Sequence, residues 1–527
     1  MPLPAKNIFY PRCWASLFLA GLALPSAAQD QGSVESPALL TPTASVLKLS
    51  NETLTLPGSE KLGMLGGEML FDVGDKLRLG GGAYGAVRGA RGGFITLGAA
   101  AELRRRITPS WVGHAGLYAG AGGGRGSNAL TGGGLMLRGD VGMSYETGRY
   151  GNLGVGISHT NFPSGLIRST QPYVQYEYPF HTLLGQGWNA APSTRSAAWP
   201  DAAAGYRVVR AEAYEFALVG RTYTIPAKVV QDNGLPQHAS MHLLGIEWLS
   251  YQDDHWFLKL ESEGALGGQS NGYMQILAGG GYRLAVSSGT AIKLHAAAGS
   301  AGGGQVDSGG GLLLDAGIAL QQQIARRMSM ELSLGAVRAP SASFQARSAG
   351  LKLNYQFGLP ELAASPVRLD ALKEFEPRHL RLRLASQTYL KADPQWRGSF
   401  AERPVSNLGV QLDYFVSPQI YLTGQGLAAY AGQAGGYMTG QVGMGRQWPL
   451  SADWSVEAEA LLGAAGGGGL AVGGGLVGQA NGNIVYRMSD AWSLLGTVGR
   501  VESPRGNFKA NVVGISLGCK LSGYAQR

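Results

Sequence analysis

Cysteine is nearly absent from this chain of 527 residues, which contains only Cys13 and Cys519. Cys13 lies in an N-terminal stretch that we expect to be removed, so the mature chain would keep Cys519 alone. A single cysteine can form no internal disulfide bond, and the fold must be stable without one.

Long hydrophobic runs are also absent. No stretch after residue 28 offers the ~20 apolar residues that a transmembrane helix requires. Charged residues make up only 15% of the chain, and the basic ones are scattered, so we expect no nucleic-acid partner. If the chain enters a membrane, it must do so with strands closed into a barrel, because only closure pairs every backbone polar group.

The N-terminus has the parts of a secretory signal peptide. Two basic residues precede the apolar segment 13–25, which is too short to span a bilayer comfortably. Ser26 and Ala28 supply the small residues needed for cleavage before Gln29. Removing residues 1–28 takes away those two bases and lowers the formal net charge from +8 to +6. We therefore expect an exported protein.

Glycine, with 83 residues, dominates the composition and marks an internal repeat. A Gly-rich segment ends in the sequence GGGL three times, at Leu135, Leu312 and Leu476. Two further similar segments flank each copy in the same order. The repeat spans about 150 residues, which is too long for a solenoid and fits a unit of several hairpins.

The repeat and the signal peptide divide the chain. The predicted parts are a signal peptide (residues 1–28), a flexible segment (29–43), repeat 1 (44–185), a linker (186–205), repeat 2 (206–358), a second linker (359–378) and repeat 3 (379–523).

Two-residue alternation predicts about eight strands in each repeat. In the first repeat the strands are expected near Ser45–Thr55, Gly63–Val73, Lys76–Val87, Gly93–Ile107, Trp111–Ala121, Gly133–Glu146, Tyr150–Asn161 and Gln171–Phe180. Short turns rich in Gly, Asn, Asp and Pro separate them, as in hairpins.

The two faces of each predicted strand differ in polarity. In the sixth strand, Arg138 and Asp140 share one face, while Leu137, Val141 and Tyr145 share the other. Many strands are long enough to cross a bilayer at the usual tilt, and aromatic residues gather near strand ends. These features resemble bacterial outer-membrane β-barrel proteins of the porin-like class. The resemblance implies an all-β, transmembrane, antiparallel up-and-down barrel in the outer membrane.

Two architectures fit three repeats of about eight strands. One is a single barrel of about 24 strands with a wide lumen. The other is three eight-stranded barrels in tandem, each filled by side chains. We prefer the single barrel, because glycine-rich inner faces would fill a small barrel poorly.

Polar residues recur at matching places in the repeats and would line a pore. The candidate pore-lining residues are Glu68, Glu247, Asp413, Arg104, Arg283, Arg138 and Asp315. In the single-barrel hypothesis, Glu68, Glu247 and Asp413 face one lumen and set its selectivity. The same residues could instead form ion pairs that only stabilise the barrel.

The leading functional hypothesis is a passive channel or export pore for a saccharide, an anionic solute or a polymer. The alternative is a non-conducting structural or surface-interaction barrel, such as an anchor or adhesin. We expect no enzyme, no cofactor and no metal site. The expected partners are outer-membrane lipid, lipopolysaccharide and the outer-membrane assembly machinery.

An outer-membrane lipid hydrolase is a minor alternative. Ser158, His159, Thr160 and Asn161 resemble the His-x-Ser-Asn element of lipid A deacylases. Here a hydroxyl follows His159 directly, and adjacent strand residues point to opposite faces. We therefore expect no catalytic residues at this element.

Overall fold

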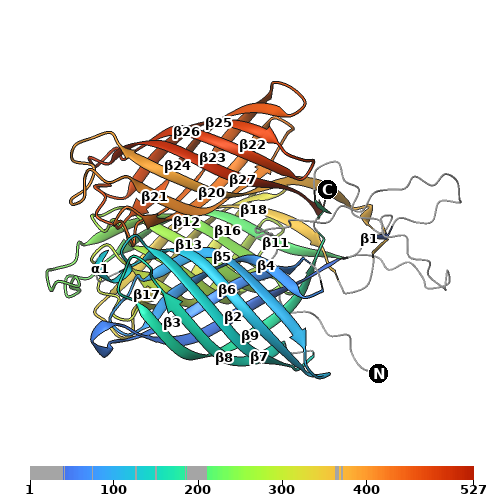
Figure 1. Cartoon of the computed structure of the whole chain (residues 1–527). Helices are drawn as coiled ribbons and strands as arrows, with labels where there is room; N and C mark the ends of the chain where they lie inside the picture. Colours follow the sequence, from blue (N-terminus) through green and yellow to red (C-terminus); the bar gives the residue numbers. More distant parts are fainter. Residues whose placement is uncertain are drawn as a thin grey trace, which may run out of the picture.

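The computed structural model describes residues 39–40, 42–73, 75–124, 128–148, 151–183, 185–186, 210–362, 367–368 and 372–526. Within these ranges the chain folds into three closed, eight-stranded antiparallel barrels, each built by consecutive hairpins (Figure 1). No helix in the described part is long and apolar enough to cross a membrane. The predicted signal peptide and most of the first linker lie outside the described residues.

The strands match the expected hairpin order in every barrel. Barrel 1 contains β2 (Thr43–Thr55), β3 (Lys61–Asp72), β4 (Leu77–Arg88), β5 (Ile95–Arg106), β6 (Trp111–Gly123), β7 (Leu135–Glu146), β8 (Asn152–Asn161) and β9 (Arg168–Thr182). Barrel 2 contains β11 (Ala211–Thr224), β12 (Ser240–Tyr251), β13 (Trp256–Gly267), β14 (Met274–Ala285), β15 (Thr290–Gly302), β16 (Leu312–Ala325), β17 (Met328–Arg338) and β18 (Gln345–Pro360). Barrel 3 contains β20 (Phe375–Lys391), β21 (Val405–Phe415), β22 (Ile420–Ala431), β23 (Met438–Pro449), β24 (Trp454–Gly466), β25 (Leu476–Arg487), β26 (Trp492–Glu502) and β27 (Lys509–Gln526).

Short elements complete the described chain. They are β1 (Leu39–Leu40), η1 (Pro57–Ser59), α1 (Asn128–Thr131), β10 (Gly185–Gln186) and β19 (Val367–Arg368). Strand β1 pairs with β19, and β10 extends barrel 3 by pairing with β27.

The preferred single barrel of about 24 strands is wrong, and the tandem arrangement is correct. The first strand of each repeat pairs with the last strand of the same repeat: β2 with β9, β11 with β18, and β20 with β27. Inward glycines make room for large side chains instead of leaving voids. A Cβ placed on Gly156 would lie 2.6 Å from the Tyr173 hydroxyl, so this glycine is needed for the ring to fit.

The predicted two-sided strands are confirmed. On β7, Arg138 and Asp140 are buried inside the barrel, while Val141 is 61% exposed on its outer wall. The same alternation runs through β13, where Lys259 and Glu261 are buried and Trp256 is exposed. The outer wall is apolar and the interior carries the charge.

The two ends of the barrels differ. The short turns, such as residues 107–110 and 286–289, lie at one end with β1 and the last residues of β27, and the longer loops lie at the other (Figure 1). We call these the short-turn end and the loop end. Transmembrane barrels commonly have short periplasmic turns and longer extracellular loops.

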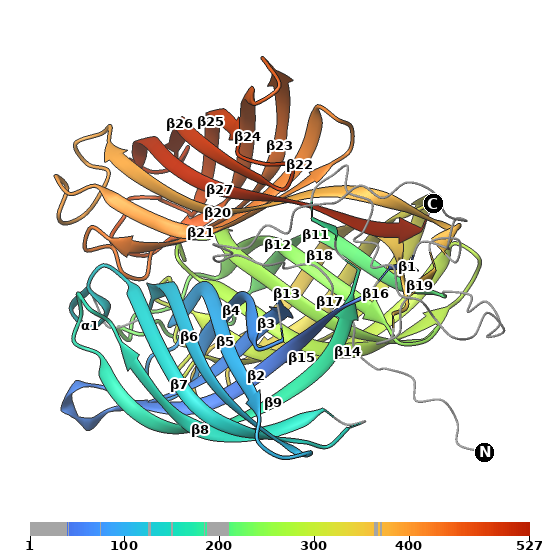
Figure 2. The same ribbon diagram turned by 45° about the vertical axis from the view of Figure 1, so that its right-hand side comes forward.

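The three barrels pack against one another in a cyclic order. The barrels lie side by side (Figure 2). Strand β4 of barrel 1 contacts β15 of barrel 2, β13 of barrel 2 contacts β24 of barrel 3, and β22 of barrel 3 contacts β6 of barrel 1. These three contacts use equivalent strands of the repeat, so the molecule has pseudo-threefold symmetry. Near the short-turn end, an apolar cluster joins residues of all three barrels, including Phe180, Tyr214 and Ala525.

Candidate functional site: three charged interiors under apolar caps

The interior of barrel 1 is held by buried ion pairs. The Arg138 guanidinium lies 3.0 Å from the Glu52 carboxylate and 2.5 Å from Asp140. The Lys48 ammonium lies 3.0 Å from Glu102 and 3.7 Å from Glu68. All six side chains are nearly inaccessible to solvent, so each charge depends on its partners.

Barrel 2 contains a longer network. Lys352 bridges Glu247 and Glu331, each at 2.8 Å. Lys293 bridges Glu331, at 2.8 Å, and Glu215, at 2.6 Å.

A second group in barrel 2 surrounds Asp315, one of the candidate pore-lining residues. Arg221 lies 3.3 Å from the Asp315 carboxylate, and Lys259 lies 3.5 Å from it. Arg221 also lies 2.7 Å from Glu261. Carboxylates and bases therefore alternate through the interior of this barrel.

Barrel 3 concentrates its charge toward the short-turn end. Arg381 donates to Asp413 at 2.7 Å and binds Glu457 through both terminal nitrogens, at 2.7 and 2.9 Å. Arg383 donates to Asp413 at 2.7 Å and also binds Glu459. Uncharged amides fill the middle of this barrel instead of ion pairs.

Equivalent positions carry different charges in the three barrels. Three residues after the leucine of each GGGL segment stand Arg138, Asp315 and Gln479. The facing position on the first strand of each barrel is Glu52, Arg221 and Gln387. The pair is therefore Glu with Arg in barrel 1, Arg with Asp in barrel 2, and two glutamines, 3.0 Å apart, in barrel 3.

A second position also reverses its charge. Glu215 pairs with Lys293 in barrel 2, at 2.6 Å. The matching residues of barrel 3 are Arg381 and Glu457, at 2.7 Å. Complementarity within each barrel is retained, whereas the sign of the charge at a given place is not.

The predicted common lumen for Glu68, Glu247 and Asp413 is wrong, because these residues lie in three separate interiors. Asp413 is also not the true counterpart of the other two. Glu68 and Glu247 lie four residues before the end of their strands, and the residue at that distance from the end of β21 is Gln411. Asp413 is the next inward residue toward the short turn.

The four remaining candidate residues lie at two depths in the barrels. Arg104 and Arg283 are both two residues before the end of their strands, near the short turns. Arg104 forms an ion pair with Asp72 there. Arg138 and Asp315 lie deeper, in the networks described above.

Sequence reasoning offered Arg78 and Lys259 as partners in the tandem arrangement, and Lys259 does pair with Glu247, at 3.3 Å. It missed other bases of the charged interiors. Lys48, Lys293, Lys352, Arg381 and Arg383 were not singled out, although each lies on a strand where inward residues alternate with apolar ones. A charged residue on the inner face of a predicted strand was the available signal. Applied to every strand, it would have found all five.

Apolar side chains close each interior at the loop end. In barrel 3, the Trp396 and Phe508 rings stack with centroids 6.2 Å apart, and Tyr437 packs beside them. Phe94 and Phe162 close the interior of barrel 1, with ring centroids 5.7 Å apart. The corresponding cluster of barrel 2 includes Tyr223, Tyr273, Val306 and Phe344. Each charged interior is thus covered by a hydrophobic cap.

Glycine-rich loops join the caps of neighbouring barrels. The Gly92 amide donates to the Gly309 carbonyl at 2.8 Å, linking barrel 1 to barrel 2. The Gly435 amide donates to the Gly132 carbonyl at 3.1 Å, linking barrel 3 to barrel 1. Asn271 completes the cycle through its side-chain amide, which donates to a carbonyl of barrel 3.

These junctions explain the repeated glycine segments of the sequence. A Cβ on Gly123 would lie 2.7 Å from the Gly436 nitrogen, and one on Gly302 would lie 2.5 Å from the Gly93 nitrogen. Two backbones meet at each junction, and only glycine leaves enough space. The sequence marker for the repeat is therefore also the contact between repeats.

The hydrolase-like element is split between two faces, as expected. Ser158 points inward and binds the buried Glu52 carboxylate. His159 lies on the outer wall, with its Nδ1 2.8 Å from the Thr170 hydroxyl. Within the described ranges, no group of three or more His, Cys, Asp or Glu residues is arranged to hold a metal ion.

Comparisons with known proteins give only distant likenesses. No family model and no curated protein matches the chain. Among solved structures, a mutant of the ferric enterobactin receptor of Pseudomonas aeruginosa is 9% identical, with 92% of this chain and 81% of that chain covered and a TM-score of 0.26. OpdQ of Pseudomonas aeruginosa is also 9% identical, with 92% and 97% covered and a TM-score of 0.20.

A designed transmembrane β-barrel is similar to one part of the chain only. It is 16% identical and covers 28% of this chain and 97% of its own, with a TM-score of 0.19. Scores this low carry no argument about function. What the protein does must be inferred from its own geometry.

Proposed function

We propose that this protein is an integral outer-membrane protein whose three small barrels form a closed, non-conducting platform at the cell surface. The apolar outer wall supports insertion in a membrane: Leu117 is 69% exposed, Leu334 64% and Val498 66%. In water such a surface would be costly, whereas lipid covers it without penalty. The predicted signal peptide supports export to the outer membrane.

Aromatic residues on the outer wall also support insertion in a membrane. Trp111 packs against Tyr145 on barrel 1, and Trp454 packs against Tyr486 on barrel 3, both at the short-turn end of the outer wall. Aromatic girdles of this kind mark the boundary between lipid and water. The short turns would face the periplasm and the glycine-joined loops the exterior.

The reversal of charge between barrels carries the non-conducting proposal. A pore that selects by charge needs the same sign around its path. Here Glu52 and Arg138 become Arg221 and Asp315 in the next barrel, and both pairs are buried. Such pairs fill and order an interior, and the apolar caps above them separate that interior from the loop end.

A planar-bilayer recording tests the proposal. Purified protein that shows heat-modifiable migration, and so is folded, is expected to give no steady conductance. A large, stable conductance from folded protein would refute the closed platform. Fractionation tests the location separately, and recovery in the soluble periplasmic fraction would refute the membrane assignment.

A narrow channel through the barrels is the second candidate. In the described structure, Asp315 Oδ1, Arg383 Nε and Asn483 Nδ2 are buried and have no hydrogen-bond partner from the protein. Water bound at such atoms would provide a polar path below the caps. If this candidate is correct, Trp396→Ala should raise conductance, with a saccharide or anionic solute as cargo. If the barrels form a closed platform, the Trp396→Ala variant should show no steady conductance either. Neither candidate assigns an enzymatic role.

A further inference from the structure

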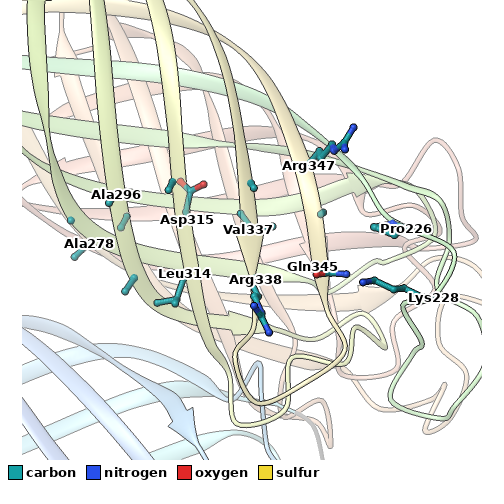
Figure 3. Close-up of a pocket in the computed structure, with 16 residues that line it drawn as sticks. Pro226, Lys228, Ala278, Ala296, Leu314, Asp315, Val337, Arg338, Gln345 and Arg347 are labelled. Atoms are coloured by element: carbon teal, nitrogen blue, oxygen red, sulfur yellow. The ribbon is translucent and has the colours of Figure 1, made fainter.

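A groove of about 960 Å³ lies on the outer wall of barrel 2, toward the loop end (Figure 3). It crosses strands β14 to β18 and reaches the loop after β11. All of its lining residues belong to barrel 2.

Small side chains form the floor of the groove. The outward residues here are Ala278, Ala296, Ala298, Ala316 and Ala336, all of them exposed. These five alanines lie on four neighbouring strands, and their small side chains leave a depression beside larger exposed residues of the same strands, such as Leu294, Ile318 and Leu334. The floor of the groove is apolar, as contact with a hydrocarbon chain requires.

Basic side chains form the rim at the loop end. Lys228 and Arg338 lie there with Gln345, and Arg347 follows on β18 (Figure 3). All three bases are exposed. No acidic residue in the described part of the chain forms an ion pair with any of them, so their charge is available to a ligand.

The other barrels have no base at the position of Arg338. Arg338 faces Leu314 across the β16–β17 pair, and the residues in the same register are Asn161 in barrel 1 and Glu502 in barrel 3. Glu502 is already bound by Arg500, at 2.8 Å. A base without an acidic partner at this position is therefore particular to barrel 2.

We propose that this groove binds a phosphorylated glycolipid of the outer leaflet, with a phosphate at Lys228 and Arg338 and an acyl chain on the alanine floor. Arginine and lysine at a membrane surface attract anionic headgroups, and arginine binds phosphate through two parallel hydrogen bonds. The proposal rests on the orientation proposed above, in which the loop end faces the exterior and the rim lies at headgroup depth.

Native mass spectrometry of the full, detergent-solubilised protein tests the site. The probes are lipid A carrying two phosphates and the same lipid A without phosphates. We expect the phosphorylated form to bind at least tenfold more tightly. The combined variant Lys228→Gln, Arg338→Gln and Arg347→Gln should remove this difference.

A matched variant controls for the loss of three charges. It combines Arg168→Gln, Arg505→Gln and Lys509→Gln, at the loop ends of barrels 1 and 3, and should bind like the parent. A floor variant, Ala296→Trp, should weaken binding while the rim is intact. Heat-modifiable migration shows that each variant is folded.

Equal binding of both lipids, or equal loss in the rim and control variants, would overturn the site. Either result from protein that fractionates with the outer membrane leaves the proposed location and closed barrels standing. Failure to fractionate with the membrane would instead refute the proposed function, whatever the binding result.

Discussion

Barrels 1 and 2 hold a reversed copy of the same ion pair, and barrel 3 replaces it with two amides. Glu52 with Arg138 becomes Arg221 with Asp315 in the next barrel. The backbone that holds the pair is the same in each case. What the fold requires at these positions is complementarity between two buried polar groups, because an unpaired one is costly. The charge itself can be exchanged or removed.

The largest expected effect comes from breaking the pair. Arg138→Met leaves the carboxylates of Glu52 and Asp140 buried without their shared base. We expect a loss of about 3–5 kcal/mol in unfolding free energy, as for other buried pairs that lose one partner. Urea unfolding in detergent, followed by gel migration, measures it.

Barrel 1 can be given the reversed ion pair of barrel 2, which tests whether the two interiors are interchangeable. The double variant Glu52→Arg and Arg138→Asp recreates the reversed pair and should recover at least half of the stability that Arg138→Met loses. If the double variant is as unstable as the single one, the two interiors are not interchangeable, and charge sign matters locally.

The junctions between barrels should come next in size. Gly466→Val would place side-chain atoms against the backbone at Gly272, where barrels 2 and 3 meet. Overpacking of this kind costs about 1–3 kcal/mol. The control is Gly440→Ala, whose Cβ has nothing within 4 Å. Protease sensitivity of the loops should rise in the first variant alone. Equal sensitivity in both would mean that the barrels do not depend on these contacts.

Amides should nearly substitute for the ionic group of barrel 2. The changes Arg221→Gln, Glu261→Gln and Asp315→Gln copy Gln387, Gln425 and Gln479 of barrel 3, and Glu263→Gln is added because Glu263 also lies 2.9 Å from Arg221. Lys259 keeps Glu247, at 3.3 Å. Removing Arg221 together with its three acidic partners avoids the isolated charge that a single change creates, so we expect a loss of only about 1–2 kcal/mol. Urea unfolding measures it. A loss larger than that of Arg221→Gln alone would contradict this expectation.

The strands and their faces could be predicted from the sequence because alternation is local. The closure of each barrel could not, since it depends on which distant strands pair. Alternation also leaves inward residues two apart indistinguishable, and for this reason Asp413 was matched to Glu68 in place of Gln411. Only the distance to the short turn separates them. The bases that complete the charged interiors, such as Lys293, were visible as polar residues on inward faces, but their partners lie on strands far away in sequence.

The smallest expected effect concerns the outer wall. The Trp454 ring packs at a tilt against the Tyr486 ring on barrel 3, with ring centroids 4.8 Å apart, and barrel 2 has Thr290 and Gln322 at these places. Trp454→Thr therefore copies barrel 2 and should cost about 1 kcal/mol, the contribution of one aromatic pair. Urea unfolding in detergent and in lipid vesicles separates two causes. A cost that appears only in vesicles assigns the pair to the membrane boundary. An equal cost in both assigns it to packing between β24 and β25, and the aromatic girdle would then offer no support for the proposed orientation.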